Sequence, residues 1–226
     1  MKKLIVPSKK EPFVEKFHFF LLWFIRATLL FSAGRSFLLG NWYVFGMSLF
    51  ALMLTFIVVL VEQRYKIDIP AEFKIGVAFL IYGSIFLGEV VKYYSTFWWW
   101  DLALHTLTGV LVGLIGFLIL LVLYRRRNVV AAPGSIALFS FALAAAVGGV
   151  WEIFEFLMDQ FFGLNMQKSG LVDTMGDIIV NDLGALLTSL IGYFYLKGGQ
   201  ISFVKRIVKR FKKENPKIAK NIVSSA

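Results

Sequence analysis

The chain has 226 residues and no cysteine, which excludes disulfides, thiolate metal ligands and a thiol nucleophile. It is 58% hydrophobic and 17% charged, whereas soluble domains are about half apolar and about a quarter charged, so the composition indicates an integral membrane protein. The net charge of +10 comes from short basic clusters between apolar runs, which favours topology signals over a nucleic-acid-binding face.

The apolar segments predict an all-α polytopic membrane protein with a bundle of six transmembrane helices. A helix needs about 20 residues to cross the hydrocarbon core. In chain order, the predicted spans are 17–34, 43–61, 74–91, 101–123, 136–159 and 173–196. The first span is longer than a usual signal-peptide core and carries Arg26, so we interpret it as an uncleaved anchor.

The segment "ISFVKRIVKRFKK" follows the sixth predicted span. Its apolar residues fall on one helical face with six basic residues around the rest, so we expect a helix on the anionic cytoplasmic leaflet. The predicted domains are therefore a six-span transmembrane domain, 1–199, and a basic amphipathic cytoplasmic tail, 200–226.

The basic residues predict the orientation. Of the 24 Lys and Arg residues, 20 lie in the N-terminal segment, the 62–74 loop, the 125–127 loop and the segment from 197 onward. By the positive-inside rule these segments are cytoplasmic. We expect a multi-pass protein of the cell membrane with both termini in the cytoplasm.

Acidic residues gather at the opposite, outer ends of three spans. At about 100° per residue, Glu152, Glu155 and Asp159 share a stripe with Ala145 and Gly148. The fourth span repeats this pattern with Asp101, His105 and Gly109, and the sixth with Asp173, Asp177, Asn181 and Gly184. Small residues beneath polar ones let helices approach closely, so we expect the acids to face one shared polar chamber that opens outward.

Two interpretations of these acids remain open. Acids near a helix end can simply reach headgroup water, and this applies above all to Asp159, Asp173 and Glu89. Clustered carboxylates repel one another unless a cation or shared protons offset them, which favours a cation or proton site. The predicted ligands are Asp101, His105, Glu152, Glu155, Asp173 and Asp177, with Asp159 and Asn181 as polar support. The cation would be Mg²⁺, Mn²⁺ or Ca²⁺ through oxygens, or Zn²⁺ with His105.

The motifs "DLALH", "WEIFE" and "DTMGDIIVNDLGA" occur in this order. Together they resemble the VanZ-like and YjdF-like families of integral membrane proteins over about residues 98–196. Where VanZ-like proteins often have Asp-Lys, this chain has Asp101-Leu102, and Glu155 replaces a common Gln. The resemblance implies a cell-envelope compartment and the polar positions above, without a reaction.

Three functions remain open. In one, the metal contacts a phospholipid or polyprenyl-phosphate ligand, with Lys168 near its headgroup and His105 or Glu152 as candidate catalytic base. In another, the acids serve an ion- or proton-coupled transporter, and in a third the protein is a membrane scaffold. The sequence lacks the HExxH, P-loop and Gly-x-Ser-x-Gly motifs, so whether it is an enzyme stays open.

Arg26 and Asp182 both fall near the middle of their spans, and Asp182 points off the predicted chamber face. Arginine does not deprotonate in proteins, so Arg26 needs a partner in the membrane. We therefore predict a structural ion pair between Arg26 and Asp182, with snorkelling of Arg26 toward the interface as the alternative.

Overall fold

The computed structural model describes residues 12–125, 131–216 and 218, and within these ranges it is helical and has no strands. In chain order the elements are α1 (Pro12–Leu38), α2 (Trp42–Leu54), α3 (Ile57–Tyr65), α4 (Ala71–Ile81), the π-helix η2 (Tyr82–Val90), α5 (Tyr93–Thr96), α6 (Trp100–Arg125), α7 (Pro133–Phe162), α8 (Leu171–Leu196) and α9 (Ser202–Glu214).

Six helical segments of the described chain are long and apolar enough to cross a membrane. They are Lys16–Leu38, Trp42–Tyr65, Ala71–Val90, Trp100–Leu121, Pro133–Phe162 and Leu171–Leu196, which confirms the predicted all-α, six-span fold within a few residues at each end. The first lysines, the end of the 125–127 cluster and most of the tail after Pro216 lie outside the described residues.

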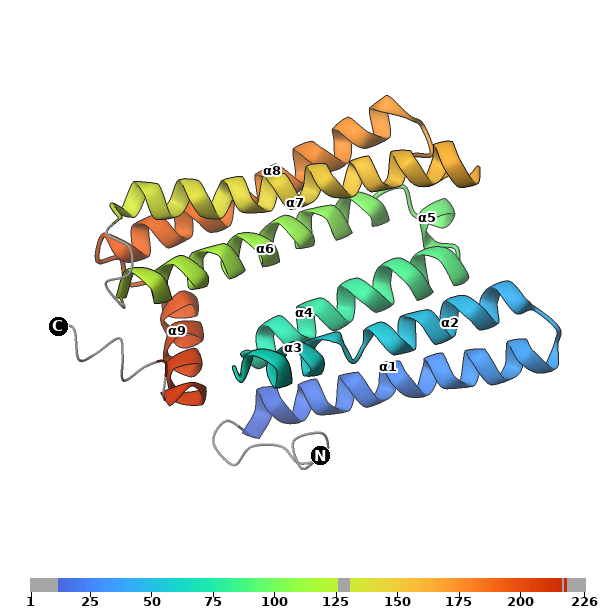
Figure 1. The fold of residues 1–226 in the computed structure, drawn as a ribbon, viewed down its shortest axis with the longest axis horizontal. Coiled ribbons are helices and arrows are strands. Elements are labelled where there is room, and N and C mark those ends of the chain that lie inside the picture. Colours follow the sequence, from blue (N-terminus) through green and yellow to red (C-terminus); the bar gives the residue numbers. More distant parts are fainter. Residues whose placement is uncertain (1–11, 126–130, 217, 219–226) are drawn as a thin grey trace. The chain divides into compact units, whose positions relative to one another are not determined.

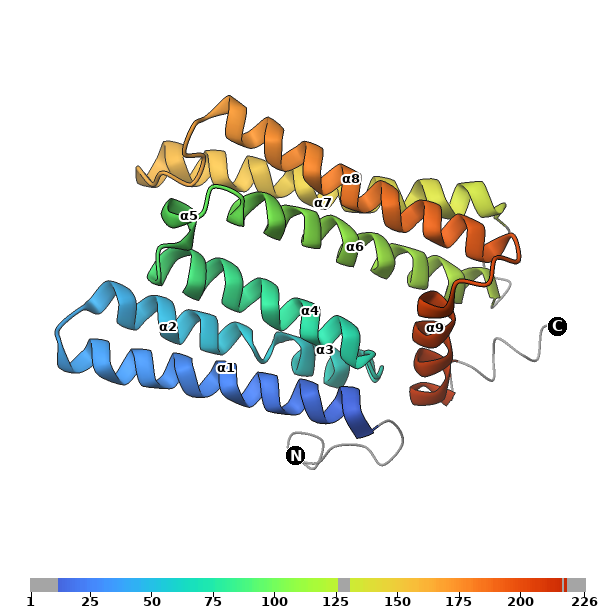
Figure 2. The ribbon, with the colours of Figure 1, turned by 180° about the vertical axis from the view of Figure 1, so that it is seen from behind.

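The chain forms two compact units, one up to Trp98 and one from Trp99 onward. The first contains three spans, built from α1, from α2 with α3, and from α4 with η2, and also the short helix α5. The second contains α6, α7 and α8, which pack against one another side by side, followed by α9 (Figures 1 and 2). The predicted division into 1–199 and 200–226 stays a prediction.

The second span is broken between Leu54 and Ile57, and Arg26 binds at the break. The Nε of Arg26, a residue that is 6% exposed, donates to Thr55 Oγ1 at 3.0 Å, and Nη2 donates to the Thr55 carbonyl at 3.2 Å. Its guanidinium also lies 4.0 Å from the centre of the Phe56 ring. The C-terminal end of a helix carries partial negative charge, so α2 and Thr55 stabilise this buried cation while Arg26 satisfies a carbonyl freed by the break.

The third span changes from α-helix to π-helix at Tyr82. The amide of Val91 donates to the carbonyl of Phe86 at 2.9 Å, five residues earlier. Gly88 permits a close contact, because a Cβ at that position would lie 2.3 Å from Tyr94 Cε2. Neither the break nor the π-helix was predicted from the sequence.

Glycines bring α6, α7 and α8 together just below the acidic residues. A Cβ on Gly109 of α6 would lie 2.0 Å from the Asn181 carbonyl oxygen of α8, and one on Gly148 of α7 would lie 2.4 Å from Asn181 Nδ2. Gly149, the next residue, has open space around it. The backbone of α6 therefore lies close to α8 at the face that carries Gly109. This contact sets the distance between His105 and Asp177, which lie one turn away on the two helices.

Helix α9 is amphipathic, as predicted, but its apolar face is covered. Val204, Ile207 and Val208 are 2%, 2% and 7% exposed. The basic side chains of Lys205, Arg206, Lys209 and Lys213 are exposed. These four basic residues, which we call the α9 basic face, are therefore accessible for the predicted contact with anionic lipid.

Candidate metal centre

The first two turns of α6 carry an acid and the histidine on one face. Asp101 and His105 are four residues apart, so they lie one above the other on the helix. Asp101 Oδ1 lies 3.6 Å from His105 Nε2, and the side chains are 15% and 9% exposed. Asp101 also stands in the first turn of α6, where the helix dipole favours a negative charge.

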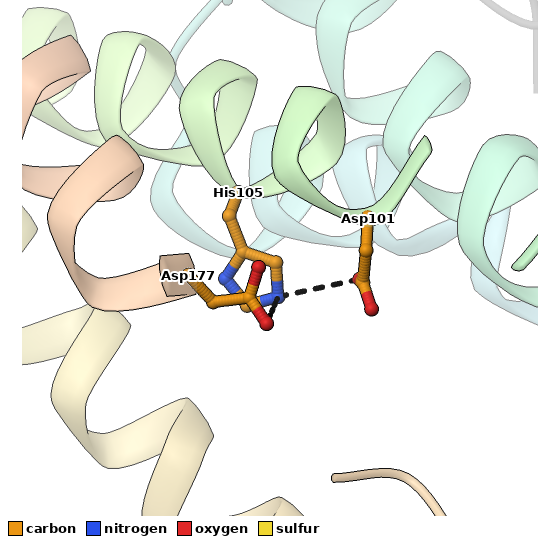
Figure 3. A group of neighbouring side chains, drawn as sticks. All are labelled: Asp101, His105 and Asp177. Carbon is orange, nitrogen blue, oxygen red and sulfur yellow. Dashed lines mark ion pairs between the residues drawn. The ribbon is translucent and has the colours of Figure 1, made fainter. Parts of the chain in front are cut away.

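Helix α8 brings Asp177 to the same imidazole. The close approach at Gly109 leaves Asp177 almost fully buried, at 1% exposure, with Oδ2 4.0 Å from His105 Nε2. Figure 3 shows the two carboxylates converging on this ring nitrogen. One ligand atom from each of Asp101, His105 and Asp177 lies within 4.8 Å of the others, and we call these residues the Asp–His–Asp group.

Helix α7 supplies Glu152 on the other side of the ring. Its Oε1 lies 3.6 Å from His105 Nδ1, and the residue is 4% exposed. Thr174 is a polar neighbour of its carboxylate. Among the described residues, neither oxygen of Glu152 nor Oδ2 of Asp177 has a partner at hydrogen-bonding distance. Buried carboxylate oxygens without donors are costly, so their charge needs another form of compensation.

Glu155 and Asp173 lie beside this group without entering it. The Oε1 of buried Glu155 accepts a hydrogen bond from Trp151 Nε1 at 2.9 Å. Asp173 is half-buried in the first turn of α8 and interacts electrostatically with Asp101. Both were predicted ligands, and their assignment stays a prediction. The Trp151–Glu155 contact has an i, i+4 spacing that the sequence analysis did not use.

Asp159 binds backbone instead of facing the other acids. Its two oxygens accept from the amides of Met166 at 2.7 Å and Gln167 at 2.9 Å. These two hydrogen bonds hold the α7–α8 loop, and the role of Asp159 as polar support for the site stays a prediction. Lys168 of this loop reaches Asp101 Oδ2 and makes an ion pair with it, a contact across 67 residues that sequence spacing does not indicate.

Asn181 lies below the Asp–His–Asp group, at 1% exposure. Its Nδ2 donates to the Ala144 carbonyl and to Asp182 Oδ1, each at 3.2 Å, while Oδ1 has no hydrogen-bond partner in the described chain. Asp182 therefore has a neighbour in its own unit, as Arg26 has Thr55 in the other unit. The pairing of Arg26 with Asp182 stays a prediction.

The donor set fits a divalent cation. In a tetrahedral zinc site with bonds of about 2.0–2.1 Å, ligand atoms lie about 3.3 Å apart. The separations of 3.6 and 4.0 Å from His105 Nε2 exceed this by about 0.3 and 0.7 Å, which side-chain rotations can remove. Lys168 pairs with the other Asp101 oxygen, and His105 Nδ1 faces Glu152. Metal-binding histidines commonly have such a carboxylate on the other ring nitrogen.

Comparisons with known proteins give one family match and one distant relative for this chain. A family described as "Predicted membrane protein (DUF2238)" matches residues 17–198. A Thermotoga maritima protein described as "Uncharacterized protein" is 29% identical over 126 residues, which are 56% of this chain and 64% of that protein, less than two thirds of its length. No solved structure matches. These comparisons do not confirm the resemblance to VanZ-like and YjdF-like proteins.

Proposed function

We propose that this chain, which belongs to the DUF2238 family of predicted membrane proteins, binds a divalent metal ion at the Asp–His–Asp group. The ligand atoms would be Asp101 Oδ1, His105 Nε2 and Asp177 Oδ2. Three protein ligands leave one or more coordination positions for water or a substrate, the arrangement typical of catalytic metal sites.

The observation that carries this proposal is the set of buried carboxylate oxygens without donors. Among the described residues, Asp177 Oδ2 and both oxygens of Glu152 are buried and have no donor at hydrogen-bonding distance, and His105 is their nearest ionisable partner, at 4.0 and 3.6 Å. An ionised carboxylate in such a place costs several kcal/mol unless a counter-charge stands nearby. A cation between Asp101 and Asp177 supplies that charge at the point where both carboxylates and the imidazole converge.

The metal is best described as Zn²⁺ or Mn²⁺. Imidazole is a common zinc ligand, and the two carboxylates also suit Mn²⁺, whereas Mg²⁺ and Ca²⁺ prefer sites made of oxygen donors and water. Because His105 would be a metal ligand, this residue is no longer available as the catalytic base. Glu152, on the other side of the ring, would orient His105 through Nδ1, and it is the remaining candidate for the catalytic base.

Charge favours a cation as the first ligand. Electrostatic repulsion acts among five acids, Asp101, Glu152, Glu155, Asp173 and Asp177. The ammonium of Lys168 offsets part of this negative charge through its ion pair with Asp101. A phosphate-bearing lipid would be repelled by these acids and would need the metal to hold its oxygens. We therefore propose metal-dependent contact with such a lipid at this end of α6, α7 and α8, which the basic-residue pattern assigns to the outer face.

Metal analysis of the purified protein in mild detergent tests the proposal. The variant Asp177→Asn removes a ligand charge, and Glu89→Gln removes an acidic charge in the other unit, outside the group. We expect about one zinc or manganese ion per chain in the wild type and in Glu89→Gln, with loss of most metal in Asp177→Asn. Equal, substoichiometric metal in all three proteins contradicts the proposal.

The lipid has a separate test. Nanodiscs that contain a phosphate-bearing lipid should protect the wild type from thermal unfolding more strongly when Zn²⁺ or Mn²⁺ is present. Protection that is equal in a chelator removes the lipid proposal and leaves the metal site standing. Metal-driven ion flux into sealed vesicles would instead favour the transporter alternative.

A further inference from the structure

The loop between α7 and α8 is a folded structure with several anchors. Asp159 accepts two backbone hydrogen bonds from Met166 and Gln167, at 2.7 and 2.9 Å. The side chain of Gln167 donates to Thr174 Oγ1 at 2.7 Å, which joins the loop to the first turn of α8. This loop therefore has a defined position over the end of the helices that carry the Asp–His–Asp group.

The anchored loop holds Lys168 against a proposed metal ligand. The Lys168 ammonium pairs with Asp101 Oδ2, while Oδ1 of the same carboxylate faces His105. Lys168 also interacts electrostatically with His105 and Asp173. The Lys168 side chain is 33% exposed, so it has space to move away from Asp101 toward water.

A metal and this ammonium interact unfavourably. Bound to the two oxygens of one carboxylate, they would lie roughly 5 Å apart, as metal–oxygen bonds of about 2 Å require. Repulsion between a divalent and a monovalent charge at that separation changes an equilibrium by about tenfold or more, even when water screens it. Asp101 also divides its charge between two cations when both are present.

We infer that Lys168 is an internal cation that competes with the metal for Asp101 and thereby weakens and regulates metal binding. The inference rests on the proposed metal site. In the metal-free protein the ammonium compensates Asp101, and on metal binding it moves off that carboxylate. Asp159 is a positioning residue, because its clamp on the loop keeps Lys168 at the site. This role differs from the lipid-headgroup contact that the sequence suggests for Lys168.

The sign of the effect separates this role from an orienting one. Neutralising a residue that merely orients a metal ligand typically weakens metal binding 10- to 100-fold. Neutralising a competing cation strengthens it. Lys168→Gln should therefore bind Zn²⁺ or Mn²⁺ at least about tenfold more tightly than the wild type, and Lys168→Arg should stay within about threefold of it.

The experiment measures dissociation constants for Zn²⁺ and Mn²⁺ by competition with a chelating dye, on the full chain in detergent. Lys197→Gln is the matched control, since Lys197 lies at the opposite end of α8 and stacks on Tyr193. Its affinity should equal that of the wild type. Asp159→Asn should bind the metal at least about threefold more tightly, because the loosened loop holds Lys168 less well. This variant also carries the test if Lys168→Gln fails to fold.

The outcomes are distinct. Unchanged or weaker metal binding in Lys168→Gln overturns the competing role, while metal binding by the wild type keeps the proposed function. Binding by Lys168→Gln but not by the wild type supports the competition. If neither protein binds metal, both proposals are wrong.

Discussion

Replacing Gly109 with alanine tests whether the close approach of α6 and α8 sets the geometry of the site. The new Cβ would stand 2.0 Å from the backbone oxygen of Asn181, whereas an ordinary contact begins at 3.4 Å. Backbone cannot rotate away as a side chain can, so the two helices have to separate locally or the chain has to bend. His105 is one turn from Gly109, and Asp177 is one turn from Asn181, so this movement separates them.

The magnitude follows from two opposing effects. Alanine in a helix interior is favoured over glycine by about 1 kcal/mol, whereas overpacking a close contact costs about 1–3 kcal/mol and sometimes more. With the obstructing atom in the backbone we expect the upper part of that range, for a net loss of about 1–2 kcal/mol. The matched control is Gly149→Ala, where nothing lies within 4 Å of the new Cβ and the change should be neutral or stabilising.

Both variants can be compared by unfolding in detergent, followed by tryptophan fluorescence, and by their affinity for Zn²⁺. We expect Gly109→Ala to unfold more readily and to bind zinc more weakly, while Gly149→Ala matches or exceeds the wild type in both assays. A Gly109→Ala protein as stable as the wild type, with unchanged zinc affinity, would refute the claim that this contact positions the site.

Three further predictions concern the rest of the chain. If Arg26 and Asp182 form the predicted ion pair, Asp182→Ala should lower stability by about 3–5 kcal/mol, and the Arg26→Leu, Asp182→Leu double variant should lose much less; equal losses in the two proteins rule out the pairing. Because the chain has no native cysteine, Ser202→Cys and Ser169→Cys each give a single labelling site. A membrane-impermeant thiol reagent should label Ser169→Cys in intact cells and Ser202→Cys only after lysis. The reverse pattern contradicts the predicted orientation. A fusion protein that carries only residues 200–226 should bind vesicles rich in anionic lipid. Changing all four residues of the α9 basic face to glutamine should weaken this binding by roughly 1 kcal/mol per charge, with vesicles of neutral lipid as the control. Binding that does not depend on vesicle charge argues against anionic lipid as the partner.

Local pattern was enough to predict the spans and the helix faces. The i, i+4 spacing of Asp101 with His105, and of Asp177 with Asn181, fixes which side chains share a face, and the glycines on those faces indicate where helices approach. These features depend on residues within one or two turns, so helix geometry predicts them. The structure then brings Asp101, His105 and Asp177 within ligand distance of one another.

Contacts between residues far apart in the sequence could not be predicted in this way. The break in the second span depends on Arg26, which binds Thr55 29 residues away. Hydropathy treats this span as continuous because the residues on both sides of the break are apolar. The Lys168–Asp101 pair likewise depends on a loop that Asp159 folds back over α7. The order of apolar and polar residues contains no direct signal for either contact.

X-ray absorption at the zinc edge, on protein loaded with one equivalent of Zn²⁺, tests the metal site most directly. We expect a site with imidazole nitrogen and carboxylate oxygen ligands at about 2.0–2.1 Å, and loss of the imidazole signal in His105→Gln. A spectrum of oxygen ligands alone, or one that His105→Gln leaves unchanged, would show that zinc binds elsewhere and would contradict the Asp–His–Asp group as its site.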